Sequence, residues 1–327
     1  MKNLLIAIVL VTAVAFGQPP AGKGKGKGGP PVDAVPVPSI PCDRACLLQM
    51  TDAYLAALVA HDPSKVTFAA NAKSVENAVV IKAGEGLWKT ASAAPTTFKI
   101  YVPDPISGEV AFMGVMQESD KPIQLGLRLR IVNKQIAQAE HLIARNLSAS
   151  QLANLQIPRP GLLAAVPANE QSSRDYMLNA GMGYYDALVA GRGSLALFAD
   201  DCVRRENGMQ TNMNPAPATP GTATISAMKC AQQLDTKTFD YIKVIDNRRV
   251  EIADLESGLV VGFSQFRHPM KEKTLKIVGV PGLTSRDMTN APFDLPAMHI
   301  FKIRGGKIHE IEAMGFMLPY NSPTGWE

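Results

Sequence analysis

Apolar residues recur at spacings of three and four in two stretches of the chain, residues 47–61 and 176–190. This spacing places the apolar side chains on one face of a helix, so both stretches are predicted to be amphipathic helices. A second, short helical segment is expected around Phe68 after the first helix and around Phe198 after the second. The pattern therefore predicts two units that open in the same way.

Alternation of apolar and polar residues predicts the strands. Each half has a polar strand that ends in Glu76-Asn77 or Glu206-Asn207, followed by strands at 110–117, 124–132 and 136–143 in the first half, and at 250–253, 259–266, 298–303 and 308–314 in the second. Hairpin turns are expected at Ser107-Gly108, Ser257-Gly258 and Gly305-Gly306. Helices followed by hairpin-linked strands indicate an α+β fold, with helices on one face of a curved antiparallel sheet.

The two halves also match in sequence. Residues 54–78 align without a gap on residues 184–208, an offset of 130 (184 − 54), with ten identities in 25 positions. A weaker match pairs Ile136 and Glu140 with Ile308 and Glu312, an offset of 172 (308 − 136). The second copy is therefore longer, and its extra residues fall in two loop-like stretches, 209–229 and 268–296. We predict a duplication, with a first domain at 42–160 and a second at 161–327.

The N-terminus predicts export. Lys2 precedes an apolar run from Leu4 to Phe16 that is too short to cross a bilayer, and small residues favour cleavage after Gly17. Residues 1–17 are thus interpreted as a signal peptide, the alternative being an uncleaved anchor. Residues 18–41 are rich in Gly, Lys and Pro and are expected to form a disordered linker. The mature protein is expected to be secreted or periplasmic, with no integral membrane contact after cleavage.

The charge gives no reason to expect a nucleic-acid partner. The formal net charge of +4 is accounted for by the four lysines of residues 1–32, which contain no acid, so the remaining chain carries 4 − 4 = 0. Nucleic-acid binding requires a basic surface.

Four cysteines remain for an oxidising compartment. Cys42 and Cys46 lie one helical turn apart, and Cys202 and Cys230 flank a segment rich in Pro, Gly and Thr. Pairing within each couple is the simplest of the three possible connectivities, and a zinc site is the alternative.

The order of elements resembles the nuclear-transport-factor-2-like or ketosteroid-isomerase-like cone, whose small-molecule members are called SnoaL-like. The strings Gly84-Glu-Gly-Leu-Trp88, Arg205-Glu-Asn-Gly208 and Gly306-Lys-Ile308 resemble a family of exported fungal and bacterial proteins built as a tandem of such cones. The resemblance covers residues 42–327. It implies a conical apolar pocket and many possible reactions, so fold alone does not name the function.

Two Glu-Asn pairs, Glu76-Asn77 and Glu206-Asn207, are the sharpest candidates for a site. A carboxylate in an apolar pocket can act as a general acid or base, and an adjacent Asn can bind a ligand. Only one residue of each pair can face the pocket, because neighbours on a strand point to opposite faces. The alternative is that Asn207-Gly208 makes a turn and Glu206 pairs with a neighbouring arginine.

Further candidates come from other elements. Trp88 could cover the pocket mouth or fill the core, and Tyr185 could contact a ligand. Asp186 replaces Ala56 of the first copy, which makes it a candidate pocket acid. His299 corresponds to Leu127 and could shuttle a proton near Glu206, or be a hydrogen-bonded core residue.

These residues predict an exported, cofactor-independent lyase, dehydratase or isomerase that acts on a small hydrophobic or sugar-like molecule. Glu206, His299 and Asp186 would be catalytic, and Asn207, Tyr185, Trp88, Glu76 and Asn77 would bind the ligand. No nucleotide-binding, nucleophile-elbow or metal-binding motif is found in the sequence. The alternative is a non-catalytic binding or scaffold protein. Either would be a monomer with pseudo-dimeric halves or a homodimer.

Overall fold

The computed structural model describes residues 41–219 and 221–327. The predicted signal peptide and residues 18–40 of the predicted linker lie outside this part of the chain. The helices are α1 (Arg44–Val59), α2 (Leu87–Thr90), α3 (Ala149–Asn154), α4 (Pro160–Leu163), α5 (Arg174–Ala190), α6 (Thr222–Ala227) and α7 (Cys230–Asp235), with short 3-10 helices η1 (Pro63–Lys65), η2 (Ala168–Glu170) and η3 (Gly193–Leu195).

The two long helices, α1 and α5, begin at the same kind of cap. The side chains of Asp43 and Ser173 accept hydrogen bonds from the backbone N–H of the third residue along, which satisfies a donor that the first helical turn leaves free. Each helix buries one face, with Tyr54 in α1 and Tyr184 in α5 fully enclosed. Both helices agree with the sequence prediction.

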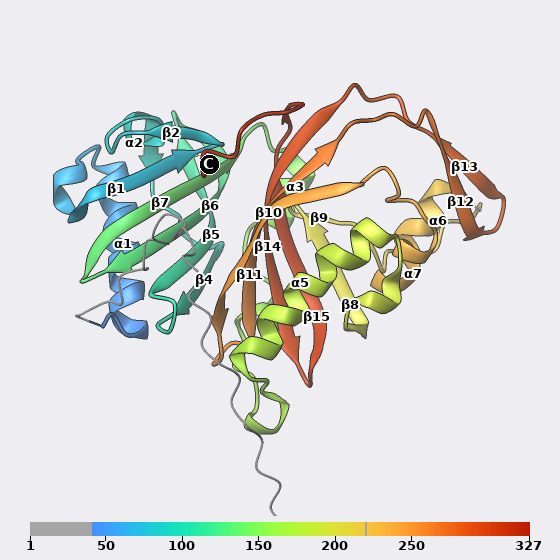
Figure 1. Ribbon diagram of the computed structural model, residues 1–327, viewed down its shortest axis with the longest axis horizontal. Coiled ribbons are helices and arrows are strands. Elements are labelled where there is room, and N and C mark those ends of the chain that lie inside the picture. Colours follow the sequence, from blue (N-terminus) through green and yellow to red (C-terminus); the bar gives the residue numbers. More distant parts are fainter. Residues whose placement is uncertain (1–40, 220) are drawn as a thin grey trace, which may run out of the picture. The chain divides into compact units, whose positions relative to one another are not determined.

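The first sheet follows α1. Its strands are β1 (Phe68–Glu76), β2 (Val79–Ile81), β3 (Ala91–Ala93), β4 (Lys99–Asp104), β5 (Glu109–Glu118), β6 (Lys121–Val132) and β7 (Gln135–Ala144). They are ordered β2-β1-β7-β6-β5-β3, with β4 also paired to β5. Figure 1 shows α1 lying across one face of this sheet.

The second sheet repeats that order when its strands are counted from the other edge, with β9 in the place of β2 and β8 in the place of β1. Its strands are β8 (Phe198–Glu206), β9 (Met209–Gln210), β10 (Val244–Asp254), β11 (Leu259–His268), β14 (Phe293–Arg304), β15 (Lys307–Gly315) and β16 (Leu318–Pro319). They are ordered β10-β11-β14-β15-β8-β9, with β16 paired to β14, and α5 crosses one face (Figure 1). The predicted α+β class is confirmed. The pairs β1–β7 and β8–β15 are parallel, and all other pairs in the two sheets are antiparallel.

The predicted second helical segments are displaced from their expected places. Short 3-10 helices do follow α1 and α5, but they end at Lys65 and Leu195. Phe68 and Phe198 are instead the first residues of β1 and β8, where they pair with Ile136 and Ile308. That pairing requires an extended backbone, which overrides the local helical pattern.

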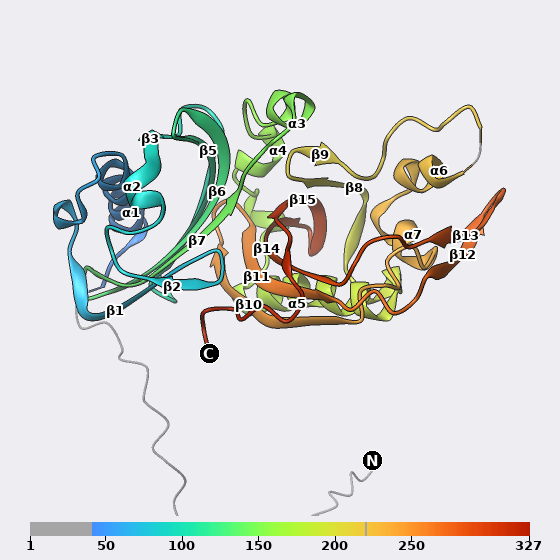
Figure 2. The same cartoon turned by 90° about the horizontal axis from the view of Figure 1, so that it is seen from above.

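The insertions of the second half contain regular structure that the sequence did not predict. Residues 209–229 include β9 and α6, and residues 268–296 include the hairpin of β12 (Thr274–Val280) and β13 (Leu283–Asp287). Figure 2 shows this hairpin beside α7. The backbone N–H of Val278 donates to the Thr236 carbonyl at the end of α7, at 2.9 Å.

Residues of both sheets share one buried cluster. It includes Met113 and Leu142 from the first sheet, and Val261, Met298 and Ile300 from the second. Buried charges join the same region, since Nη1 and Nη2 of Arg249 donate to the two oxygens of Glu140 at 2.6 and 2.7 Å. The two sheets are therefore packed together rather than linked loosely.

Both disulfides join the cysteine couples that the spacing favoured. Cys42 bonds to Cys46, and Cys202 bonds to Cys230. Among residues 41–219 and 221–327, no helix is long and apolar enough to cross a membrane.

Candidate functional site

A cavity of about 130 Å³ lies between α5 and the second sheet, and we call it the inner cavity. It is lined by Tyr184 and Leu188 of α5, by Arg204, Glu206 and Asn207 at the end of β8, by Phe239, Tyr241 and Ile242 after α7, and by Phe266, His268, Leu295, Ala297, His299, Ala313, Met314 and Gly315 of the later strands. Most of these side chains are apolar or aromatic, as in typical small-molecule pockets.

Small residues create this cavity. In the first sheet, His141 pairs with Glu76 on one side and with Leu127 on the other. In the second sheet, Ala313 pairs in the same way with Glu206 and with His299. The two sheets can therefore be compared position by position. Leu125, His141 and Ile143 of the first half correspond to Ala297, Ala313 and Gly315 of the second. The second half thus lacks three large side chains where the inner cavity lies.

Trp88 fills the corresponding region of the first half. Its indole is fully buried and packs edge-on against Tyr54, with ring centroids 5.1 Å apart. His141 bridges the ring of Tyr54 and the carboxylate of Glu76, with Nε2 2.8 Å from the hydroxyl and Nδ1 3.1 Å from Oε2. Glu76 also accepts from the backbone N–H of Leu87. Tyr54, His141 and Glu76 therefore form one hydrogen-bonded group inside the first half.

Arg204 is the buried charge of the inner cavity, and it occupies the position of Ser74. Its Nε donates to the Thr211 hydroxyl at 2.9 Å, and Nη2 donates to Oε1 of Gln233 at 2.8 Å. Its guanidinium lies 4.9 Å from the centre of the Phe239 ring. These contacts fix the orientation of the guanidinium, because the two hydrogen bonds are donated by different nitrogens, Nε and Nη2.

Glu206 faces Arg204 across the cavity mouth. Its Oε1 is 3.1 Å from Nε of Arg204, and its side chain is 49% exposed, against 12% for Glu76. The Glu206 carboxylate therefore meets both solvent and cavity, which is the position a proton-transferring group needs.

The two asparagines end their strands in the same way. Asn77 and Asn207 both have positive φ, 47° and 45°. The Asn207 amide donates to the Gly315 carbonyl and accepts from its N–H, both at 2.9 Å, and Asn77 bonds equivalently to Ile143. Both side-chain amides are thus hydrogen-bonded to the backbone of a neighbouring strand, although Asn207 also lines the inner cavity.

The aromatic and imidazole groups of the cavity are held neutral. Burial raises the pKa of Tyr184 to about 12, so its hydroxyl stays protonated. Burial, assisted by the positive charge of Arg204, lowers the pKa of His299 to about 3. Burial also lowers the pKa of His268 to about 4. Neither imidazole carries a charge at neutral pH, so each can donate or accept a hydrogen bond but cannot act as a cation.

Tyr185 is not one of the residues that line the inner cavity. Its hydroxyl is 3.3 Å from Nδ1 of His299, and it packs over Gly262, where an added Cβ would approach the tyrosine oxygen to 2.4 Å. The residue at the position of Gly262 in the first half is Phe112. Tyr185 therefore positions His299.

Asp186 is outside the cavity lining. Its carboxylate accepts from Nη1 of Arg248 at 2.6 Å, and its side chain is 59% exposed. The structure thus brings together Glu206, Asn207 and His299 of the sequence candidates, and it separates Asp186, Trp88, Glu76 and Asn77 from them.

Sequence reasoning considered Arg204 only as a surface partner of Glu206, a pair that the structure does contain, and it missed Tyr241 and His268. Arg204 shares the face of Glu206, two residues away on one strand, so its position could have been inferred from strand alternation. Tyr241 follows the inserted segment, and His268 lies at the end of a strand longer than predicted. Tyr241 has no counterpart in the first half, whereas the strand registers place His268 at the position of Glu118.

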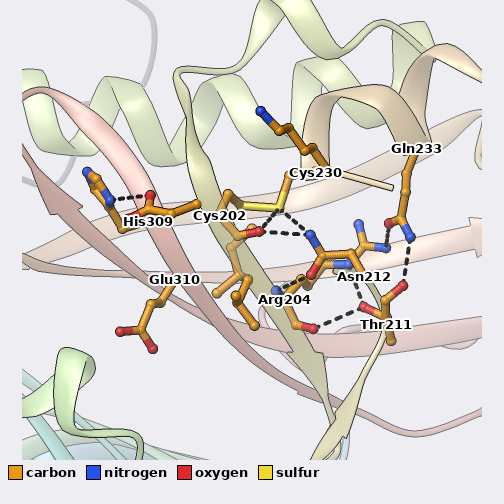
Figure 3. Close-up of a disulfide and its surroundings, with 12 residues drawn as sticks. Cys202, Arg204, Thr211, Asn212, Cys230, Gln233, His309 and Glu310 are labelled. Atoms are coloured by element: carbon orange, nitrogen blue, oxygen red, sulfur yellow. Dashed lines mark hydrogen bonds and ion pairs between the residues drawn. A yellow bond between two sulfur atoms is a disulfide. The ribbon is translucent and has the colours of Figure 1, made fainter. Parts of the chain in front are cut away.

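The disulfide Cys202–Cys230 anchors the segment that brings Phe239 and Tyr241 to the cavity. Figure 3 shows the disulfide beside Asn212, whose amide donates to the Cys202 carbonyl at 2.8 Å. Asn212 also accepts from the backbone N–H of Arg204 at 2.7 Å. The same close-up shows Gln233 and Thr211 reaching Arg204. In the described part of the chain, no three His, Cys, Asp or Glu side chains gather as a metal site would require.

A protein-family model described as "Domain of unknown function (DUF8021)" matches residues 41–143 and 170–315. The match takes in both sheets and the residues of the inner cavity. No curated protein matches the chain.

Several solved structures are similar to parts of the chain, and these neighbours include ketosteroid-isomerase-like folds. A protein from Sphaerobacter thermophilus is 14% identical, covering 30% of this chain and 96% of its own, with a TM-score of 0.26. A protein named as a candidate polyketide cyclase from Silicibacter is 13% identical, covering 44% and 90%, with a TM-score of 0.26. A Catenulispora acidiphila protein with a ketosteroid isomerase-like fold, in complex with trimethylamine, is 14% identical, covering 34% and 94%, with a TM-score of 0.23.

Proposed function

The chain belongs to the DUF8021 family, and we propose that the inner cavity of its second half binds a small carbonyl compound on which Glu206 transfers a proton. The observation that carries this proposal is the replacement of Leu125, His141 and Ile143 by Ala297, Ala313 and Gly315, which opens a cavity beside a buried arginine and an accessible carboxylate.

The roles follow from the charges. Glu206 takes a proton from the carbon next to the carbonyl, and the negative charge that develops on the carbonyl oxygen is stabilised by Arg204 and by the neutral hydroxyl of Tyr184. Return of the proton to another carbon is an isomerisation. Loss of a group from the carbon beyond, which leaves with its bonding electron pair and takes up the proton held by Glu206, is a lyase or dehydratase reaction. Each outcome needs only groups that line the inner cavity.

The cavity limits the size of the reacting part of the substrate. Its volume of about 130 Å³ is close to the roughly 150 Å³ of an engineered cavity that holds benzene. We therefore propose a substrate whose enclosed part has about the size of one six-membered ring. This accommodates a hydrophobic ring or a sugar-like ring.

We also propose that the protein works outside the cytoplasm. Two disulfides support this location, because such bonds persist in oxidising compartments. The sequence of residues 1–17 has the pattern of a signal peptide. Determining the N-terminal residue of the protein recovered from medium or periplasm tests this, and Gln18 is the expected first residue.

Hydrogen exchange with solvent tests the reaction whichever product it forms. Cyclic and open-chain ketones and sugar-like carbonyl compounds would be incubated with the protein in D₂O, and loss of carbon-bound hydrogen followed by NMR. Glu206→Gln should slow exchange at least about 100-fold, the usual contribution of a general base. Glu76→Gln is the matched control, since Glu76 holds the same strand position in the first half. Equal exchange by wild type and Glu206→Gln would exclude Glu206 as the base.

A binding protein without turnover is the second candidate. Its support is the ion pair of Glu206 with Arg204, which already satisfies both charges, together with two histidines held neutral. In this case a ligand would bind and be recovered unchanged, and no deuterium would enter it.

A further inference from the structure

A second and larger cavity lies on the opposite face of the second sheet, and we call it the outer cavity. Its volume is about 430 Å³, roughly three times that of the inner cavity. Residues 159–165, from the segment that joins the two halves, form one wall, and β8, β14 and β15 supply the other. On β14, His299 and Phe301 pack with α5 inside the second half, whereas Lys302 and Arg304 line the outer cavity.

Almost every charged residue that lines the outer cavity has a partner of opposite charge. Nη1 of Arg159 lies 3.0 Å from Oε2 of Glu310. The carboxylate of Asp201 lies 3.4 Å from Nη2 of Arg304 and 2.6 Å from Nδ1 of His309. Figure 3 shows His309 near the disulfide and Glu310 pointing away from it. These pairs leave one charged side chain to be explained, Lys302.

Lys302 is a buried cation without a carboxylate. It is 3% exposed, and among the described residues no Asp or Glu oxygen lies within 4.0 Å of its ammonium. Nζ donates to the carbonyl oxygens of Ala164 and Ser257, the second at 2.6 Å. An ammonium has three N–H donors, so one remains for another acceptor. Burial, the largest effect, lowers the pKa of Lys302, although the charges of Glu310 and Asp254 act in the opposite direction.

A buried charge is costly unless an opposite charge pairs with it. We propose that the outer cavity is a second binding site, which holds the carboxylate of a small organic monoanion on the ammonium of Lys302.

The surroundings of Lys302 favour a monoanion over a phosphate. Asp201 and Glu310 line the same cavity and offset the charges of Arg304 and Arg159, so only the single charge of Lys302 remains for a ligand to balance. Pro160, Ala164 and Val203 offer apolar surface for the rest of the ligand. A carboxylate with a short hydrocarbon or aromatic body therefore fits the lining, whereas a compact dianion has no apolar part to bury and carries one negative charge more than Lys302 balances.

The test compares benzoate with benzamide, which has the same shape and no charge. Binding to the full protein would be measured by NMR titration, with amide shifts of β14 and of residues 159–165 reporting on the outer cavity. We expect saturable shifts there with benzoate and at least tenfold weaker binding of benzamide. Inorganic phosphate should not displace benzoate.

Two substitutions in the exposed wall isolate the effect of charge. Ala165→Glu adds a carboxylate beside the outer cavity and should weaken benzoate about fivefold or more, while Ala165→Gln, of nearly the same size, should leave it unchanged. Neither substitution touches a buried group, so both variants should fold. Lys302→Met should abolish the benzoate shifts, and Lys307→Met, at an exposed lysine outside the lining, is its control.

Three results would overturn the proposal. The first is equal binding of benzoate and benzamide. The second is benzoate binding that Ala165→Glu and Ala165→Gln affect alike, and the third is displacement of benzoate by phosphate at similar concentration. Benzoate shifts confined to β8 and β11 would assign the anion to Arg204 of the inner cavity instead.

Discussion

His299 and Leu127 occupy matching positions in the two sheets, so the second half buries an imidazole where the first buries a hydrocarbon. The pKa of His299 falls to about 3 in the folded protein, against about 6.5 when unfolded. The folded protein therefore favours the neutral imidazole of His299 over the protonated one. Stability from this residue is complete above about pH 6.5 and is lost as the pH falls towards 3.

We predict that His299→Leu flattens the acid side of the stability profile. The wild type should lose up to about 1.4 kcal/mol per pH unit through this histidine below pH 6.5, and the variant should not. Urea unfolding at pH 7 and pH 4.5 measures the difference. His268, whose pKa falls to about 4, stays in both proteins, so some acid dependence should remain. Identical profiles for wild type and variant would mean that His299 is not buried in its neutral form.

The asparagines that follow the two glutamates are expected to stabilise the fold. Each takes a left-handed backbone conformation and bridges to a neighbouring strand with two hydrogen bonds. Asn207→Ala and Asn77→Ala should each lose about 2 kcal/mol of unfolding free energy, measured by denaturant titration. If Asn207→Ala unfolds like the wild type and loses only ligand, the amide of Asn207 belongs to the binding site.

At the scale of elements, the segment between β9 and β10 completes the inner cavity, and the disulfide Cys202–Cys230 holds α7 of that segment against β8. Removing it by Cys202→Ser with Cys230→Ser should cost about 3.5 kcal/mol, because it closes a loop of 28 residues. Removing Cys42–Cys46, a loop of four, should cost about 2 kcal/mol. Thermal or urea unfolding compares them. A larger loss from Cys42–Cys46 would show that loop length does not set the effect.

Much of this architecture could be predicted from sequence periodicity. Both long helices, most strands and the hairpin turns follow from apolar spacing and from glycines such as Gly108 and Gly258, whose φ values are positive. The parallel pairing of β1 with β7 and of β8 with β15 could not, because no local pattern specifies which strands meet. The β12–β13 hairpin was also missed, because residues 268–296 were interpreted as a loop-like insertion although Leu275 and Ile277 alternate there with polar residues.

The site was only partly predictable, for a different reason. The offset of 172 already aligned Leu125, His141 and Ile143 with Ala297, Ala313 and Gly315. Their sizes indicate a cavity only once the strand pairing shows that they are neighbours. Strand alternation places Arg204 on the face of Glu206, but its burial becomes evident only when its partners Thr211 and Gln233 are seen.

At the scale of the whole described molecule, the two sheets share one core and a buried ion cluster. Glu140 of the first sheet binds Arg249 of the second, and Arg128 of the first lies 3.2 Å from the same carboxylate. The positive charges of both arginines hold the pKa of Glu140 below its usual range, although its burial opposes this. The carboxylate is therefore ionised throughout the neutral range.

Glu140→Gln is predicted to destabilise the whole molecule, not one half. Removing the anion leaves the guanidinium of Arg249 without its carboxylate and takes from Arg128 one of its two carboxylate partners, a loss of about 3 kcal/mol. Because the halves share a core, calorimetry should record a single transition for wild type and variant, the second at lower temperature. Two separate transitions in the wild type would show that the halves unfold independently.

The most direct test of the account is native mass spectrometry of the protein purified from its own host, beside the variant Ala297→Leu. This variant gives the second half the side chain that Leu125 provides in the first, so it fills the inner cavity. We predict one small molecule bound per wild-type chain, and its loss from Ala297→Leu while the variant stays folded. A wild type that carries no small molecule, or a ligand that persists in Ala297→Leu, would contradict the inner cavity as the functional site.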